Sequence, residues 1–104
     1  MYYKLLQIDF PVDGPWREEM TTTYSELAAH ISQTPGLLWK IWTENVETGE
    51  AGGIYLFEDE TSAQNYLTEH TTRLESFGIQ NIRAKIFDVN QQLSEITKFT
   101  FIKK

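Results

Sequence analysis

The sequence predicts an α+β fold in which two helices cover one face of a four-stranded antiparallel sheet. Four short runs rich in aliphatic and aromatic residues have the length and the bounding turn residues of strands. Two longer segments repeat their apolar residues every three or four positions, as amphipathic helices do. The segments follow in the order β-α-β-β-α-β, so both helices are expected on the same face of one sheet.

The first strand and the first helix occupy the N-terminal third of the chain. Residues 2–10 are rich in Tyr, Leu, Ile and Phe, and Pro11 ends the run. Pro15 is tolerated in the first turn of a helix and favours a helix start at this point. The apolar stripe of the helix consists of Met20, Tyr24, Leu27, Ala28 and Ile31. The Thr-Pro-Gly sequence at 34–36 then ends the helix.

A strand hairpin and a second helix follow. Residues 37–46 and about 51–58 are expected to form two strands, because a short Glu-Thr-Gly-Glu turn separates them. Asp59 or Thr61 is the expected N-cap of the second helix. One face of this helix carries Ala63, Tyr66, Leu67, His70 and Leu74.

The C-terminal part completes the sheet. Gly78 ends the second helix, since glycine readily adopts a left-handed conformation, and residues 81–89 form the fourth strand. Residues 93–102 carry two signals: Leu93 and Ile96 have helical spacing, whereas Phe99, Phe101 and Ile102 suggest an extended tail. The complete order is that of the ferredoxin-like fold, a split βαβ unit repeated once. The 104 residues fit one domain, spanning 1–104.

Composition excludes several classes of partner and chemistry. The net charge of −6 disfavours binding to nucleic acid and to anionic membranes. The chain has no cysteine, which rules out disulfides and thiolate chemistry. No apolar run approaches the ~18 residues of a transmembrane helix, and the N-terminus does not resemble a signal peptide, so a cytoplasmic location is expected. The two histidines are forty residues apart, and neither a metal site nor a cofactor is predicted.

The sheet face away from the helices predicts a homodimer. Trp39 and Trp42 point to opposite faces, and the prediction directs Trp39 toward the helices. Beside Trp42, on the other face, the prediction places Lys40, Tyr55, Phe57 and Phe87. An exposed aromatic face is a binding site or an aggregation hazard, so a second copy is expected to cover it. In the alternative, the protein is a monomer and its C-terminal tail covers this face.

Several segments, in order along the chain, resemble a known family. They are 35–44 (PGLLWKIWTE), 50–57 (EAGGIYLF), the pairs Tyr66-Leu67, His70-Thr71 and Arg73-Leu74, and 84–90 (AKIFDVN). These segments are similar to the YdhR-type putative mono-oxygenases of the dimeric α+β-barrel superfamily, from the first strand to about Ser94. The resemblance implies a ferredoxin-like dimer. The superfamily contains cofactor-independent oxygenases of aromatic polyketides, haem-degrading enzymes and lactone isomerases, so the fold alone does not assign an activity.

The candidate site residues follow from their chemistry. His70 titrates near neutral pH and is the candidate base, with Arg73 one helical turn later as its catalytic partner. Substrate contacts are predicted for Trp42, Tyr55, Phe57, Phe87 and Lys40. Arg83 and Lys85 are further cations that could meet an anion. In the alternative interpretations, His70 is a partly exposed helix residue, the aromatic residues form only a dimer interface, and the cations form salt bridges.

Two functions of different classes are compatible with this pattern. The first is a cofactor-independent mono-oxygenase that oxidises a small aromatic or polyphenolic compound in a pocket between the sheet and the helices. Such an enzyme needs a base, a cation for the substrate anion and a dry apolar pocket. The second is a non-catalytic dimer that binds a small hydrophobic metabolite. An isomerase or decarboxylase-like enzyme using the same pocket is a third possibility.

Overall fold

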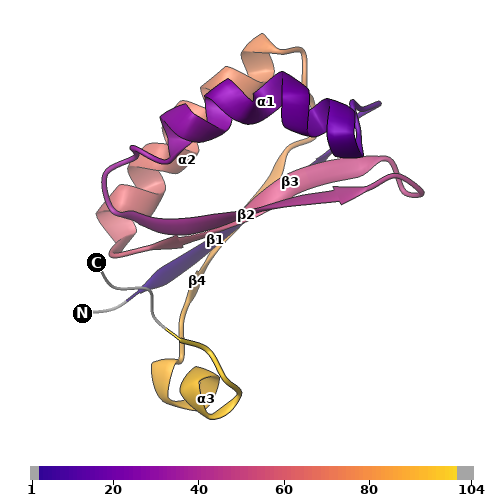
Figure 1. Cartoon of the computed structure of the whole chain (residues 1–104). Helices are drawn as coiled ribbons and strands as arrows, with labels where there is room; N and C mark the ends of the chain where they lie inside the picture. The colour runs from indigo at the N-terminus through magenta and orange to yellow at the C-terminus, as the bar shows by residue number, and fades with distance from the viewer. Residues whose placement is uncertain (1–2, 101–104) are drawn as a thin grey trace.

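The structure is a computed structural model that describes residues 3–100. Its elements are β1 (Lys4–Pro11), α1 (Arg17–Ile31), β2 (Leu37–Asn45), β3 (Glu50–Phe57), α2 (Glu60–Ser76), β4 (Arg83–Asp88) and α3 (Gln91–Ile96). The strands form one antiparallel sheet in the order β2-β3-β1-β4, with α1 and α2 on the same face (Figure 1). The predicted fold class is therefore confirmed.

The two long helices begin in different ways. At α2, the side chain of Asp59 accepts a hydrogen bond of 2.8 Å from the backbone N–H of Ser62, which makes Asp59 a local N-cap. At α1, the preceding residue Trp16 provides no side-chain cap. Instead, Glu44 of β2 accepts a 2.8 Å bond from the backbone N–H of Arg17. The start of α1 is thus held by a neighbouring strand rather than by its own sequence.

The core lies between the sheet and the two long helices. It contains ten buried residues: Leu6, Ile8, Phe10, Ile31, Ala51, Tyr55, Phe57, Ala63, Tyr66 and Leu74. Leu6 of β1 pairs with Tyr55 of β3 on one side and with Ile86 of β4 on the other. Side chains of directly paired residues share a face, so this row fixes the face that the helices cover.

The structure corrects the predicted faces of β2 and β3. Lys40 pairs with Tyr55, so both face the helices, and the ring of Trp42 stacks on Tyr24 of α1 with centroids 6.3 Å apart. Phe57 is also in the helix-side core. Trp39, predicted to face the helices, pairs with Leu56 on the opposite face.

The physical reason for this error is the composition of the hairpin. Both alternating sets of β3, Ile54 with Leu56 and Tyr55 with Phe57, are apolar, so the pattern contains no inside–outside contrast. A change of one residue in the assignment exchanges the two faces of the whole strand. In β1, by contrast, Leu6, Ile8 and Phe10 alternate with Gln7 and Asp9, and the same alternation of apolar and polar residues marks the helix side of β4.

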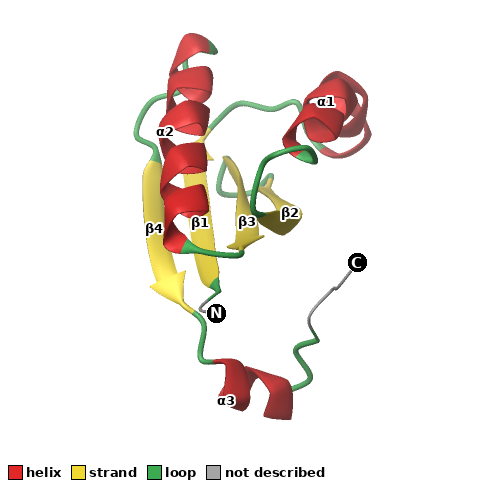
Figure 2. Cartoon of the chain, turned by 90° about the vertical axis from the view of Figure 1, so that its left-hand side faces the viewer, coloured by secondary structure: helices red, strands yellow, loops and turns green. Residues whose placement is uncertain are grey.

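The short helix α3 projects beyond the end of β4, away from the two long helices (Figure 2). The side chain of Asn90 caps it by accepting a 3.1 Å bond from the N–H of Leu93. The helical signal of Leu93 and Ile96 is therefore confirmed, whereas the predicted tail residues Phe101 and Ile102 lie outside the described residues. Within residues 3–100, no helix is long and apolar enough to cross a membrane.

Candidate functional site

A small cavity lies between the sheet and the two helices. Its volume is about 50 Å³, and its walls come from the three strands β1, β2 and β3, from both long helices and from the loop after β1. The polar groups at the cavity are those of Lys40, Tyr55 and His70, and most of the other lining side chains are apolar. Polar groups that converge in an apolar hollow are typical of a ligand site.

Lys40 of β2 projects into this region beneath the helices. Its Nζ lies 3.4 Å from the ring centre of Trp42 and 4.8 Å from that of Tyr55, two cation–π contacts. Gly53 of β3 makes room for it, because a Cβ there would lie 2.8 Å from Cε of Lys40. Among residues 3–100, Lys40 forms no ion pair with a carboxylate. Burial, assisted by the positive charge of Arg73, lowers the pKa of Lys40 to about 7.

Three residues of α2, spaced by four and three positions, form a polar cluster, and its member His70 lines the cavity. The ring of His70 stacks on Tyr66 with centroids 4.9 Å apart, and only 4% of His70 is exposed. Arg73 Nη1 lies 2.7 Å from His70 Nδ1, and Arg73 Nη2 lies 3.4 Å from Glu69. Residues at i, i+3 and i+4 share one helix face, which brings these groups together.

The contact with Arg73 fixes the proton on His70. A guanidinium can only donate, so Nδ1 of His70 accepts and the neutral ring carries its proton on Nε2. Burial, together with the positive charges of Lys40 and Arg73, lowers the pKa of His70 to about 3. The ring is therefore neutral at pH 7 and offers one N–H as a donor.

Two tyrosines close the cluster. The hydroxyl of Tyr66 lies 3.4 Å from the hydroxyl of Tyr55, and the two rings are 4.9 Å apart. Burial raises the pKa of Tyr66 to about 12 and raises the pKa of Tyr55 further. Both phenols thus remain protonated at neutral pH and add no negative charge to the site.

Comparison with known proteins identifies the family. Residues 5–100 match the family model described as "Putative mono-oxygenase ydhR". The chain belongs to this ydhR family. A solved structure, the NE2512 protein of unknown function from Nitrosomonas europaea, has the same fold, with a TM-score of 0.62 and 12% identity over 86% of this chain and 91% of that chain. No curated protein matches the chain.

The predicted site residues of this ydhR-family chain separate into two groups. Lys40, Trp42, Tyr55 and His70 line the cavity together, and Arg73 reaches it through His70. Phe57 lies behind them in the core, with its ring 5.6 Å from that of Tyr66. Phe87 lies on the opposite sheet face, where it pairs with Leu5 and is 44% exposed. Its predicted position beside Trp42 is therefore wrong.

Two parts of the site were not assigned from the sequence. Tyr66 had been placed only in the apolar stripe of its helix, although its spacing of four from His70 was a usable signal. The α1 wall, formed by Met20, Tyr24 and Leu27, is predicted only as part of the apolar stripe of its helix. Within residues 3–100 of this family member, no three His, Asp or Glu side chains gather as potential metal ligands.

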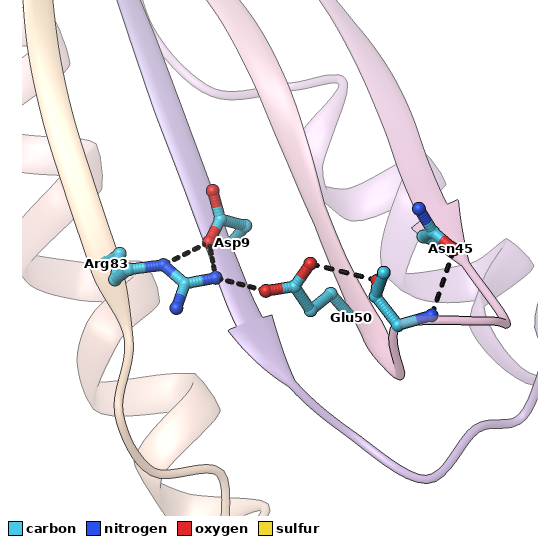
Figure 3. Close-up of polar contacts among 5 residues, drawn as sticks. Asp9, Asn45, Glu50 and Arg83 are labelled. Atoms are coloured by element: carbon cyan, nitrogen blue, oxygen red, sulfur yellow. Dashed lines mark hydrogen bonds and ion pairs between the residues drawn. The ribbon is translucent and has the colours of Figure 1, made fainter.

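Arg83 belongs to a separate network on the opposite sheet face (Figure 3). Its Nε donates a 2.6 Å bond to Asp9, and its Nη2 lies 2.5 Å from Glu50. Glu50 also accepts a 3.0 Å bond from the hydroxyl of Thr48, whose backbone N–H donates to Asn45. Two carboxylates neutralise Arg83, which supports its interpretation as a salt-bridge residue rather than an anion-binding one.

Proposed function

We propose that this chain is a mono-oxygenase that oxidises a small aromatic or polyphenolic compound, bound as its anion in the cavity between the sheet and the helices. One observation carries the proposal. Among residues 3–100, Lys40 is a partly buried cation without a carboxylate partner, and it lines a mostly apolar cavity together with the N–H donor His70. A phenolate or enolate would supply the missing negative charge. Family membership supports oxygen chemistry in general terms.

The proposed reaction uses the substrate as the source of electrons. Deprotonation of an activated C–H or O–H bond gives an electron-rich anion, which transfers electrons to O₂. For a CH₂ group next to a phenolic ring, R₂CH₂ and O₂ give R₂C=O and H₂O, so one oxygen atom enters the product. The protein then needs a base, donors for the anion and a site from which water is excluded.

The contacts favour Lys40 as the base and His70 as a donor. Nδ1 of His70 is occupied by Arg73, and protonation of the ring is disfavoured by two neighbouring cations. Lys40 has a pKa of about 7, so a large fraction of its amine is free to accept a proton at neutral pH. The ammonium that forms would then stabilise the substrate anion. The role of His70 as general base remains a prediction, and its contacts support it less well.

The cavity must enlarge to admit such a substrate. Its volume of about 50 Å³ is far below the ~300–1,000 Å³ of typical ligand sites. Because α1 forms its outer wall and buries only Ile31 fully, displacement of α1 is the simplest way to enlarge it.

Isotope incorporation tests the proposal. Under ¹⁸O₂, a panel of quinols and polyphenols should yield a product that carries one ¹⁸O atom, together with enzyme-dependent oxygen uptake. Lys40→Met should lower the rate at least tenfold, whereas Lys85→Met, on the opposite face, serves as the matched control and should not. If no compound of the panel causes enzyme-dependent oxygen uptake, or if Lys40→Met and the wild type take up oxygen at equal rates, this assignment is excluded.

We also propose that the chain acts as a homodimer through the sheet face away from the long helices. Ile41 and Phe87 on this face are 53% and 44% exposed, and Leu93 and Ile96 of the projecting α3 are 62% and 77% exposed. Within the described residues, Phe99 after α3 lines a groove on this face together with Trp39 and Phe87. Sedimentation equilibrium at micromolar concentration should give twice the chain mass. A monomer mass would contradict the dimer and favour the alternative, in which the C-terminal tail covers this face.

The second candidate function is binding without turnover. The mostly apolar walls of the cavity favour it, since a small hydrophobic molecule would be bound there by burial of its apolar surface. It predicts that such ligands raise the melting temperature without any oxygen uptake or change in ligand mass.

A further inference from the structure

The environment of Lys40 differs from that of another lysine on the same sheet face. Lys4, at the other end of this face, pairs with Asp88 and with Glu60, and these carboxylates raise its pKa. Lys40 instead lies at a mostly apolar cavity, has no carboxylate partner among residues 3–100 and is close to the guanidinium of Arg73, and these features outweigh its two cation–π contacts. The environment of Lys4 therefore stabilises an ammonium, whereas that of Lys40 favours a neutral amine.

We propose that Lys40 is a nucleophilic amine that condenses with the carbonyl carbon of a small apolar ketone, aldehyde or 1,3-dicarbonyl compound to form an imine. Its position at an apolar cavity, the absence of a carboxylate partner among residues 3–100 and the nearby cation Arg73 are the features that activate an amine for this reaction. The lowered pKa agrees with this geometry, because only the unprotonated amine is a nucleophile.

The condensation requires no oxidant and no further reactant. The nitrogen lone pair attacks the carbonyl carbon, and one N–H proton moves to the oxygen to give a carbinolamine. Loss of the hydroxyl group as water, with the second amine proton, then forms the C=N bond. The sum is one amine and one carbonyl giving one imine and one water, with no change in oxidation state.

The neighbouring donors define the ligand class further. His70 carries its proton on Nε2, and both His70 and Lys40 line the cavity. A ligand with a second carbonyl group could therefore accept a hydrogen bond from His70 while its first carbonyl reacts with Lys40. Tyr55, whose ring lies 4.8 Å from the amine, offers a second protonated donor. A 1,3-dicarbonyl compound satisfies this arrangement best, and its imine tautomerises to a conjugated enaminone.

This inference is independent of the proposed oxygenation, since imine formation proceeds without O₂. The test is therefore carried out under argon, with the full chain and acetylacetone at pH 7.5. Enaminone formation is followed by ultraviolet absorbance, and the modified lysines are identified by peptide mass mapping. We expect one adduct per chain, at Lys40, forming at least tenfold faster than any adduct at Lys85.

The variants separate a specific reaction from general lysine modification. Lys40→Arg retains a cation but cannot form an imine, so the fast phase of enaminone formation should vanish in this variant. Lys85→Arg should retain the fast phase. If Lys40→Arg fails to fold, site mapping in the wild-type chain still decides. Equal modification rates at Lys40 and Lys85, or no adduct at Lys40, would overturn the proposal, whatever the outcome of the oxygen experiment.

Discussion

The two long helices cover the same sheet face but pack against it in different ways. α2 buries Ala63, Tyr66, His70 and Leu74, whereas α1 buries only Ile31. In Figure 2, α2 lies along β1 and β4, while α1 is seen end-on beyond β2. The site groups Tyr66, His70 and Arg73 come from α2, and α1 contributes mainly apolar side chains such as Met20 and Tyr24.

This difference separates the two requirements of a binding site. The polar groups need fixed positions, which the well-packed α2 provides. The cavity needs a variable volume, and an element with few buried contacts opens at a low free-energy cost. We therefore interpret α2 as the fixed wall and α1 as the movable wall.

The largest expected effect is on the free energy of unfolding, and it distinguishes the wall formed by α2 from the wall formed by α1. Tyr66→Ala removes a large aromatic ring from the core and should lower the free energy of unfolding by ~3–5 kcal/mol. The matched change on α1, Tyr24→Ala, should cost about 1–2 kcal/mol, because this half-buried ring loses fewer contacts. Urea denaturation measures both. Equal losses would show that α1 is packed as firmly as α2.

The next effect concerns the two tryptophans of β2. Trp42→Ala removes the ring between Tyr24 and Lys40 and should cost about 2–3 kcal/mol. It should also enlarge the cavity and weaken ligand binding. Trp39→Ala acts on the opposite face and should weaken self-association instead. Thermal melts and sedimentation of both variants check this, and a monomeric Trp42→Ala with an intact dimer of Trp39→Ala would reverse the assignment of faces.

A third prediction concerns the pH dependence of the stability that Lys40 causes. The pKa of Lys40 is about 7 in the folded chain, against about 10.5 when unfolded, so the unfolded state binds more protons between these values. Lys40 therefore destabilises the fold most at and below pH 7, and this penalty disappears as pH rises to about 10.5. Lys40→Met should raise the free energy of unfolding by ~1–2 kcal/mol at pH 6.5 and by much less at pH 10. Denaturation at both pH values measures this, and a gain that does not change with pH would contradict the lowered pKa.

The smallest effect concerns the starts of the helices. Asp59→Ala removes the local cap of α2 and should cost about 1 kcal/mol. Glu44→Ala removes the contact from β2 to Arg17 and should cost about 0.5 kcal/mol. The Glu44 change should nevertheless speed amide hydrogen exchange in the first turns of α1 and leave α2 unaffected. Faster exchange in α2 would mean that the helices open together.

The sequence predicted the elements better than the site. Turn residues and helical spacing identify every strand and both long helices, since these signals are local. The faces of β2 and β3 could not be predicted, because Tyr55 and Ile54 are both apolar and only packing under α2 selects between them. Lys40 is predicted from the sequence only as a substrate contact, since its lowered pKa depends on burial and on Arg73, which is distant in sequence.

The titration of the lysine side chains tests most directly whether Lys40 is a desolvated amine with a lowered pKa. The chain contains six lysines, and NMR of the ¹³Cε nuclei reports the ionisation of each. We expect one lysine to titrate near pH 7 and its signal to disappear in Lys40→Arg, while the carboxylates beside Lys4 hold the pKa of that lysine above its ordinary value. Titration of all six lysines above pH 10 would contradict a desolvated, unpaired amine at the cavity and, with it, the proposed chemistry of Lys40.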